Sequence, residues 1–361
     1  MDGPVNEPDH HRESRRANSV RIRACSIAGV GVLSFVIALV GQMSPKPTAQ
    51  PPRPFQAWLA NLTDEAMRRG FDRRLVTRAL SGLQPLPRVI EADRAQVASS
   101  PALDIYLSQR LTSDRIARGR EQMREHRSLL GRIERLFGVQ PRFVVAIWGV
   151  ETGYGAHTGD VPVFQALATL AWDPRRAPYF REELFQALSI GQQEDIAIES
   201  MTGSWAGAMG QPQFMPSSYA KYAVDFDGDG RRDIWRSIPD TLASIANYLR
   251  TFGWHNTETW GREVRVTIAA RNRILRSVMA RETGCGAIRR LTTRRQLGEW
   301  GADGVRMAND LPLPRADIGA SLVLTADTRT FLVYRNFESI LAYNCSLAYA
   351  LSVAMLADAV R

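Results

Sequence analysis

The chain has 361 residues, which is more than one average domain and enough to bury a sizeable core. Its formal net charge of +9 suits an anionic partner such as nucleic acid, anionic lipid or a polyanionic cell wall. Export, which the N-terminal segment predicts, argues against nucleic acid as that partner, and the sequence has no internal repeats and no long runs of Lys or Arg that would favour it.

The first 54 residues have the pattern of a targeting segment followed by a linker. Residues 1–23 are polar with five arginines, residues 24–40 are apolar without a charge, and prolines recur from Pro45 to Pro54. This order predicts a signal peptide or a signal anchor, with the rest of the chain exported. Seventeen apolar residues are at the short limit for crossing a bilayer, so cleavage and anchoring both remain open.

Residues 55–140 are predicted to form an N-terminal helical region. Thr63 and Asp72 are candidate N-caps, and apolar residues recur with helical spacing after Asp72. Residues 113–137 have the periodicity of one long amphipathic helix. Its arginine-rich outer face is expected to be solvated surface.

The stretch RFVVAIWGVETGYG, residues 142–155, is the strongest candidate for a buried functional helix. Gly138 is placed to end the preceding helix, and Pro141 suits the first turn of the next one. The apolar run leads directly to Glu151, which we expect at the C-terminal end of a buried helix. Burial and the helix C-terminus both disfavour the carboxylate, which raises its pKa toward the range that a general acid needs. The alternative is a structural Glu151 that bonds a nearby arginine.

Residues 203–235 are rich in glycine, aromatic and amide side chains, which suits a groove for a polar polymer. Within them, residues 225–233 read DFDGDGRRD, with alternating aspartates around a central glycine. Since four aspartates this close repel one another, a cation would supply the missing countercharge. The pattern fits positions one, three, five, seven and nine of a calcium loop, which are Asp225, Asp227, Asp229, Arg231 and Asp233.

Further helices are predicted over residues 161–169, 181–200 and 241–252. Residues 262–281 are ambiguous, with strand-like alternation first and a helical pattern later. Residues 321–325 and 330–334 are expected to pair as a β-hairpin, and a last apolar helix should end near Ala359. The chain is therefore predicted to be α+β and mainly α.

The segments GVETGYG, PRRAPYF, AGAMGQPQFMPSSY and DFDGDG resemble, in this order, the family 3 (B-type) lytic murein transglycosylases of bacteria. The resemblance covers roughly residues 57–356 and implies a lysozyme-like helical catalytic core. It also implies a periplasmic, monomeric enzyme that acts on peptidoglycan glycan strands, either soluble or tethered to the inner membrane by residues 24–40.

Five parts are expected along the chain. Residues 1–54 are the leader and linker, and residues 55–140 are the N-terminal helical region. The catalytic core with its calcium loop would span residues 141–260, and a small α/β region with a hairpin would span residues 261–335. Residues 336–361 would then return to the core.

The resemblance further implies a substrate groove around Glu151. Taken alone, Tyr106 would be a half-buried core tyrosine, and Arg175 and Arg176 would be surface charges. The implied groove residues are Tyr106, Arg175, Arg176, Tyr179, Ser204, Gln213, Tyr248, Tyr343, Asn344 and Tyr349.

The calcium loop departs from an EF-hand at position twelve, where Arg236 stands in place of glutamate. In the family that the chain resembles the loop is longer, and its last acid matches Asp240. We expect a structural Ca²⁺ held by this loop. The alternative role of Asp240 is a helix N-cap.

Cys285 and Cys345 are the two cysteines outside the leader. An even pair in an exported chain predicts a disulfide. Neither cysteine has a histidine at metal or nucleophile spacing, so zinc binding and thiol catalysis are discounted.

Glycosidases ordinarily need two carboxylates, and this sequence supplies one well-placed candidate, Glu151. In lytic transglycosylases, one Glu protonates the bond oxygen between N-acetylmuramic acid and N-acetylglucosamine. It then takes the proton of the muramyl C6 hydroxyl, which closes a 1,6-anhydro ring, and the resemblance implies this activity. Two alternatives stay open, a hydrolytic muramidase for the same bond and a non-catalytic, calcium-stabilised wall-binding protein.

Overall fold

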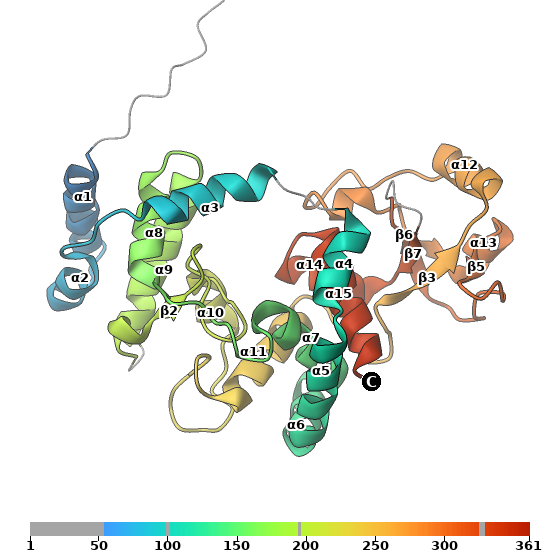
Figure 1. Cartoon of the computed structure of the whole chain (residues 1–361), viewed down its shortest axis with the longest axis horizontal. Helices are drawn as coiled ribbons and strands as arrows, with labels where there is room; N and C mark the ends of the chain where they lie inside the picture. The colour runs from blue at the N-terminus through green and yellow to red at the C-terminus, as the bar shows by residue number, and fades with distance from the viewer. Residues whose placement is uncertain (1–53, 99–101, 194–195, 325–328) are drawn as a thin grey trace, which may run out of the picture. The chain divides into compact units, whose positions relative to one another are not determined.

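The computed structural model describes residues 54–98, 102–193, 196–324 and 329–361 (Figure 1). They belong to one compact unit, Pro51–Arg361. The predicted leader at residues 24–40 lies outside the described part. Among the described residues, no single helix is long and apolar enough to cross a membrane. The pair α14 (Arg335–Tyr343) and α15 (Leu347–Ala359) reaches that length only when joined across a bend of 118°.

The N-terminal region is helical, as predicted, but one of its two predicted caps is wrong. Asp72 does cap the second helix, where its carboxylate accepts a bond from the N–H of Leu75 at 3.0 Å. Thr63 lies inside the first helix instead, because its hydroxyl donates to the carbonyl of Leu59 one turn earlier. The helices are α1 (Phe55–Arg68), α2 (Arg73–Leu80), α3 (Pro87–Ala98), α4 (Leu103–Arg110), α5 (Ser113–Glu125) and α6 (Arg127–Phe137).

The single long helix predicted over residues 113–137 is wrong. The chain breaks at His126, which has a non-helical backbone and joins α5 to α6. The two halves pack on different neighbours, because α5 lies against α7 (Pro141–Thr152) and α6 lies mainly against α11 (Ile238–Thr251). Periodicity alone does not show such a break, since the apolar spacing continues through it.

The helices predicted between α6 and the sheet are present with shifted ends, and the helix at Pro216–Tyr222 was not predicted. The helix predicted from residue 161 begins at Val163, because β1 (Val161–Pro162) pairs antiparallel with β2 (Thr202–Gly203). The helix predicted over residues 181–200 ends at Gln193, and Ile198 packs back beside Gly191. These elements are α8 (Val163–Trp172), α9 (Ala177–Gln193), η1 (Ile198–Ser200) and α10 (Pro216–Tyr222).

A small antiparallel sheet has the strand order β4-β6-β7-β3-β5. The predicted hairpin is present, with Ser321 opposite Val333, although residues 325–328 are outside the described part. The ambiguous stretch 262–281 resolves into a strand and then a helix. The elements are β3 (Gly261–Arg265), α12 (Ile268–Ser277), η2 (Ile288–Arg290), β4 (Arg295–Gln296), α13 (Leu297–Ala302), β5 (Arg306–Met307), β6 (Gly319–Leu322) and β7 (Thr330–Val333).

Three hydrophobic cores hold these elements together. The first surrounds α7 and draws on α4, α6, α11, α14 and α15. The second joins α1 and α2 to α8, α9 and α10, and the third lies between the sheet and helices α12 and α13. The first core therefore brings the C-terminal helices α14 and α15 against α7, and it positions the end of α7.

Candidate active site

Glu151 lies in the last turn of α7, at the place that the sequence predicts. Gly138 ends α6 with a left-handed backbone and Pro141 is the first residue of α7, so the helix start is locally encoded. Every residue from 143 to 150 is buried, and Gly153 ends the helix with φ of 60°. Glu151 thus projects from the C-terminal end of a buried helix.

The environment of Glu151 keeps its carboxyl group protonated at higher pH than usual. Burial raises its pKa to about 7, although a hydrogen bond from Tyr349 and the positive charge of Arg110 both act to lower it. The Tyr349 hydroxyl donates to Glu151 Oε1 at 2.6 Å. A carboxyl group that titrates near neutral pH can give a proton and later take one back.

A row of tyrosines leads away from Glu151. Tyr349 stands near the start of α15, and its ring is stacked on that of Tyr343 with centroids 6.5 Å apart. The ring of Tyr248 from α11 follows at 4.7 Å from Tyr343. The Tyr343 hydroxyl donates to the carbonyl of Pro212 at 2.6 Å, which ties this row to the loop after β2. Three of the predicted groove residues therefore form one aromatic cluster beside Glu151, in which Tyr248 and Tyr349 are buried and Tyr343 is partly exposed.

Gln211, which the sequence-based site did not include, fixes the end of α7. Its Oε1 accepts a bond from Trp148 Nε1 at 2.8 Å, and its backbone carbonyl accepts one from the Thr152 hydroxyl at 2.9 Å. Gly155 has φ of +82°, and a Cβ there would lie 2.5 Å from Gln211 Oε1. Only glycine leaves room for this contact. The helix end that carries Glu151 is therefore locked to the segment between β2 and α10.

Helix α4 supplies a second residue that was missed. Arg110 carries a charge that lowers the pKa of Glu151, and its guanidinium lies 5.3 Å from the ring centroid of Tyr106. Tyr106 also acts electrostatically on Tyr349. A signal for Arg110 existed, since residues four apart share a helix face and Tyr106 was already a candidate.

The side chains of Ser204 and Gln213 both form hydrogen bonds with backbone groups. Ser204 Oγ accepts from the N–H groups of Ala206 and Ala208, at 3.3 and 3.2 Å. Gln213 has φ of 52°, and its amide donates to the carbonyl of Thr158 at 3.0 Å. A left-handed backbone at a non-glycine residue is strained, and such residues concentrate at functional sites.

Arg175 and Arg176 both form ion pairs with Asp93 of α3. Both guanidinium groups bond the Asp93 carboxylate, and Arg175 also donates to its backbone carbonyl at 2.9 Å. Although burial raises the pKa of Asp93, these bonds hold it below its usual value. Tyr179 follows on α9 with 48% of its surface exposed. The two arginines thus share one buried acid and keep one net positive charge between them.

Asn344 is exposed in the turn between α14 and α15. The next residue, Cys345, forms a disulfide with Cys285, with Cα atoms 6.3 Å apart. The bond holds this turn against the segment before η2. Asn344 therefore lies on a braced turn, three residues after the helix residue Leu341 and five before Tyr349.

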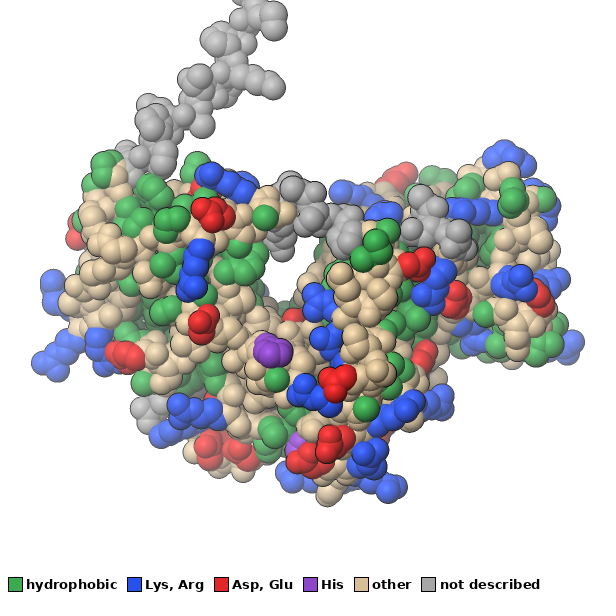
Figure 2. Space-filling model, in the orientation of Figure 1, with side chains coloured by type: hydrophobic (Ala, Val, Ile, Leu, Met, Phe, Trp, Pro, Cys, Tyr) green, Lys and Arg blue, Asp and Glu red, His purple; other side chains and the backbone are tan. Residues whose placement is uncertain are grey.

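Figure 2 shows a hollow in the surface, at the place where Figure 1 has α3, α8 and α9 on one side and α4 and α15 on the other. The predicted groove residues come from both sides. Tyr106 is on α4 and Tyr349 on α15, while Tyr179 is on α9. An extended polymer could reach both groups of side chains in such a hollow.

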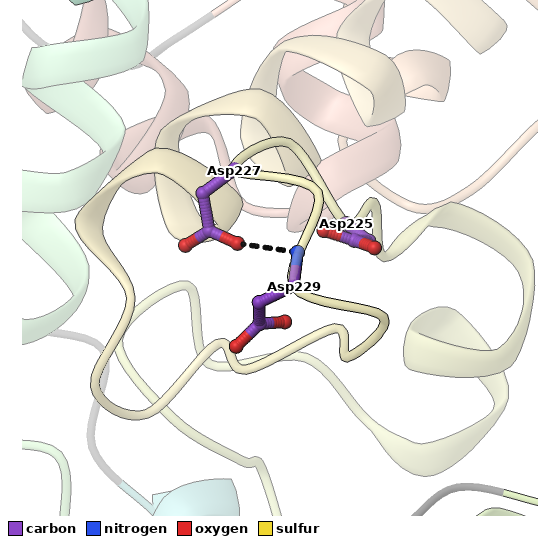
Figure 3. A group of neighbouring side chains, drawn as sticks. All are labelled: Asp225, Asp227 and Asp229. Atoms are coloured by element: carbon purple, nitrogen blue, oxygen red, sulfur yellow. Dashed lines mark hydrogen bonds between the residues drawn. The ribbon is translucent and has the colours of Figure 1, made fainter.

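The aspartates of the predicted calcium loop converge in part. One carboxylate oxygen from each of Asp225, Asp227 and Asp229 lies within 4.8 Å of the others. Figure 3 shows the three side chains on one turn of the loop, with the N–H of Asp229 bonded to Asp227 Oδ1 at 3.3 Å. Oxygen ligands from alternating aspartates at this spacing fit a hard cation such as Ca²⁺.

The two later acids are turned toward the loop backbone. Asp240 is fully buried and accepts bonds from the N–H groups of Phe226 at 2.8 Å and Asp233 at 2.9 Å. Asp233 accepts from the N–H of Trp235 at 3.0 Å. The N-cap of α11 is Ser237, so the alternative role of Asp240 as that cap is wrong. Asp240 instead joins both ends of the loop, and Arg231 lies exposed between them.

Comparison with known proteins identifies the family. The protein-family model described as "Transglycosylase SLT domain" matches residues 54–358 of the sequence. The chain belongs to this family. It is 32% identical over 306 residues to membrane-bound lytic murein transglycosylase B of Escherichia coli K12, covering 81% of this chain and 79% of that one.

Solved structures of the family have the same fold. SltB3 of Pseudomonas aeruginosa, in complex with NAG-anhNAM-pentapeptide, is 41% identical with a TM-score of 0.76 over 85% of this chain and 79% of that chain. The E. coli lytic transglycosylase Slt35, in complex with calcium, is 30% identical with a TM-score of 0.68 over 84% of this chain and 92% of that chain. The family resemblance, the mainly α lysozyme-like fold and the enzyme class are therefore confirmed.

Proposed function

We propose that the chain cleaves the β-1,4 bond between N-acetylmuramic acid and N-acetylglucosamine in peptidoglycan, with Glu151 as the acid and then the base. The observation that carries this role is the Glu151 pKa of about 7 at the end of a buried helix. Among the described residues, the groups that shift this pKa are Tyr349 and Arg110, and neither is a carboxylate.

The chemistry needs one carboxyl group because the nucleophile is internal to the sugar. Protonated Glu151 gives its proton to the glycosidic oxygen as the bond from C1 breaks. The C6 hydroxyl of the muramyl unit then attacks C1, and the Glu151 carboxylate takes its proton. The product is a 1,6-anhydro sugar, Glu151 is protonated again, and no water is consumed.

Tyr349 and Arg110 suit the state between the two proton transfers. At that point Glu151 is a carboxylate, and the hydrogen bond from Tyr349 stabilises this charged form. The positive charge of Arg110 acts in the same direction. Burial favours the protonated form and these two groups favour the charged form, which keeps the two states close in free energy.

The groove residues are proposed to bind the glycan and its peptide. The ring of Tyr343, which is partly exposed, can pack on a sugar face, while the buried ring of Tyr349 supports it from behind. The positive charge that remains on Arg175 and Arg176 after Asp93 is paired can attract a substrate carboxylate. SltB3 was solved with NAG-NAM-pentapeptide and with NAG-anhNAM-pentapeptide, and this ligand class is what the groove would accept.

A structural Ca²⁺ is proposed for the loop of Asp225, Asp227 and Asp229. The gathered carboxylate oxygens support it, as does the calcium complex of Slt35. The ion would neutralise the three charges and hold the loop closed beside α11. An enzyme that acts on the cell wall would work in the periplasm, where residues 24–40 would either have been cleaved or hold it at the inner membrane.

The decisive experiment is product analysis on purified murein sacculi. Muropeptides released by the enzyme should weigh one water less than lysozyme products and should resist borohydride, because no reducing end forms. Glu151→Gln is the control and should release none. Products of full mass that borohydride reduces would show a muramidase, and no bond cleavage at all would show a wall-binding protein.

A further inference from the structure

Helix α12 carries an apolar stripe on its outer surface. Ile268 is 81% exposed and Leu275 is 47% exposed, and Met279 just beyond the helix is 65% exposed. Ile268 and Leu275 are two turns apart, so they share one face. Ala270 and Ile274 are buried on the opposite face. No described part of the chain covers the outer stripe, although α12 is held firmly by its inner face.

Positive charge is concentrated around this stripe. Between Glu263 and Glu282 there are five arginines and no acidic residue. Two of them, Arg265 and Arg281, pair with Asp310 and Glu338, and the other three are on α12. Residues 261–335 contain fourteen arginines, no lysine and seven acidic residues, which is a net charge of +7. The first 50 residues account for +2 of the chain's +9, so the rest of the exported part is neutral overall. The basic character predicted for the exported protein therefore comes from the small α/β region.

The arginines of α12 lie on both sides of the apolar stripe. At 100° per residue, Arg271 is on one flank of the line through Ile268 and Leu275, and Arg276 is on the other. Figure 2 shows basic side chains beside hydrophobic ones at the position of α12. Exposed apolar side chains with an arginine on either flank are a pattern found on helices that lie in a membrane interface.

We propose that the outer face of α12, with Met279, is a docking surface for an anionic phospholipid bilayer. Acyl chains would accept Ile268, Leu275 and Met279, and lipid phosphates would pair with the flanking arginines. A glycan strand is polar and offers nothing to cover three apolar side chains. Lipid satisfies both features of the surface, and the predicted leader brings the chain to a membrane.

The surface is preformed, so docking needs no folding step. Thr267 caps α12 by accepting a bond from the N–H of Ala270 at 3.2 Å. Strand β3 precedes the helix directly, with Val264 buried in the core of the sheet. A bilayer that holds α12 would therefore also hold the whole α/β region, independently of residues 24–40.

Hydrogen exchange on the full-length chain tests this proposal locally. The chain is reconstituted in vesicles of phosphatidylglycerol and phosphatidylethanolamine, and in phosphatidylcholine vesicles for comparison. Amides of residues 266–280 should exchange at least about tenfold more slowly in the anionic vesicles than in the neutral ones. A local readout is needed because residues 24–40 could bind either vesicle.

Two pairs of substitutions separate the contribution of the apolar side chains from that of the arginines. Ile268→Asn with Leu275→Asn should remove the protection, and Arg271→Gln with Arg276→Gln should weaken it, by about fivefold for each arginine. Leu136→Asn is the matched control, since Leu136 is 56% exposed on α6. It should leave the protection unchanged, and all variants should keep their lytic activity.

Several outcomes would overturn the proposal. Equal protection of residues 266–280 in neutral and anionic vesicles would show that residues 24–40 merely hold α12 close to any bilayer. No protection in either kind of vesicle would show that α12 stays in water. Protection that needs no vesicles and grows with protein concentration would show a second copy on this face. Protection by isolated sacculi would show a wall polymer there.

Discussion

Glu151→Gln should stabilise the fold at neutral pH while it abolishes activity. The pKa of Glu151 is raised to about 7 in the folded chain, against 4.5 for an ordinary glutamate. Between these values the folded state binds more protons than the unfolded state, so the stability of the wild type falls as pH rises. Glutamine keeps the shape of the side chain and an acceptor for Tyr349, but it has no charge to bury.

The size of the effect follows from the difference between the folded and unfolded pKa values of Glu151. A difference of one pKa unit corresponds to about 1.4 kcal/mol in the free energy of unfolding. Because Glu151 is partly exposed, the gain is smaller than the full difference in pKa implies, which leaves roughly 2 to 3 kcal/mol above pH 7. Below about pH 4 both states of the wild type are protonated, so the variant and the wild type should be equally stable. Activity should fall by at least about 10² to 10⁴-fold, because one group performs both proton transfers.

Urea unfolding at a series of pH values measures the first effect, and muropeptide release from sacculi measures the second. Glu121→Gln is the control for loss of an exposed charge on α5. The stability gain of Glu151→Gln should appear only as pH rises between about 4.5 and 7. A gain of the same size at every pH, or a variant less stable than the wild type at pH 8, would refute the burial argument. Activity above a tenth of wild type would place the acid elsewhere.

Further predictions concern Tyr349 beside Glu151, the calcium loop and the disulfide. Tyr349→Phe removes the bond that lowers the Glu151 pKa, so the alkaline limb of the pH–activity profile should move to higher pH; an unmoved limb would contradict this. Calcium should raise the melting temperature of the wild type but not of Asp227→Ala or Asp229→Ala, and a wild type indifferent to chelator would argue against the ion. Cys345→Ser should lower the free energy of unfolding by about 2 to 4 kcal/mol in denaturant titrations, and an unchanged midpoint would show that the disulfide constrains nothing.

Local signals predicted the elements that depend on neighbours in sequence. Gly138 ends a helix and Asp72 begins one, because capping is decided within a few residues. The same signals failed where packing decided the outcome. The helix over residues 113–137 breaks at His126 because its halves meet different partners.

Some of the predicted groove residues contact groups that are distant in sequence. Asp93 lies more than 80 residues from Arg175 and Arg176, and its buried carboxylate pairs with both arginines. No pattern around either arginine indicates that contact. Ser204 has local partners instead, because its hydroxyl accepts bonds from nearby backbone groups. Only the folded structure shows that Arg175 and Arg176 share an ion pair and are not simply solvated charges.

By itself, the sequence determined that Glu151 ends a buried helix, since an apolar run, a carboxylate and then a glycine leave little choice. It also determined the alternating aspartates of the loop that begins at Asp225. Only the tertiary structure decided what surrounds the carboxyl group, because Tyr349 is 198 residues away and Arg110 comes from another helix. Proton affinity depends on burial and on charges in space, and chain folding alone brings those groups to Glu151.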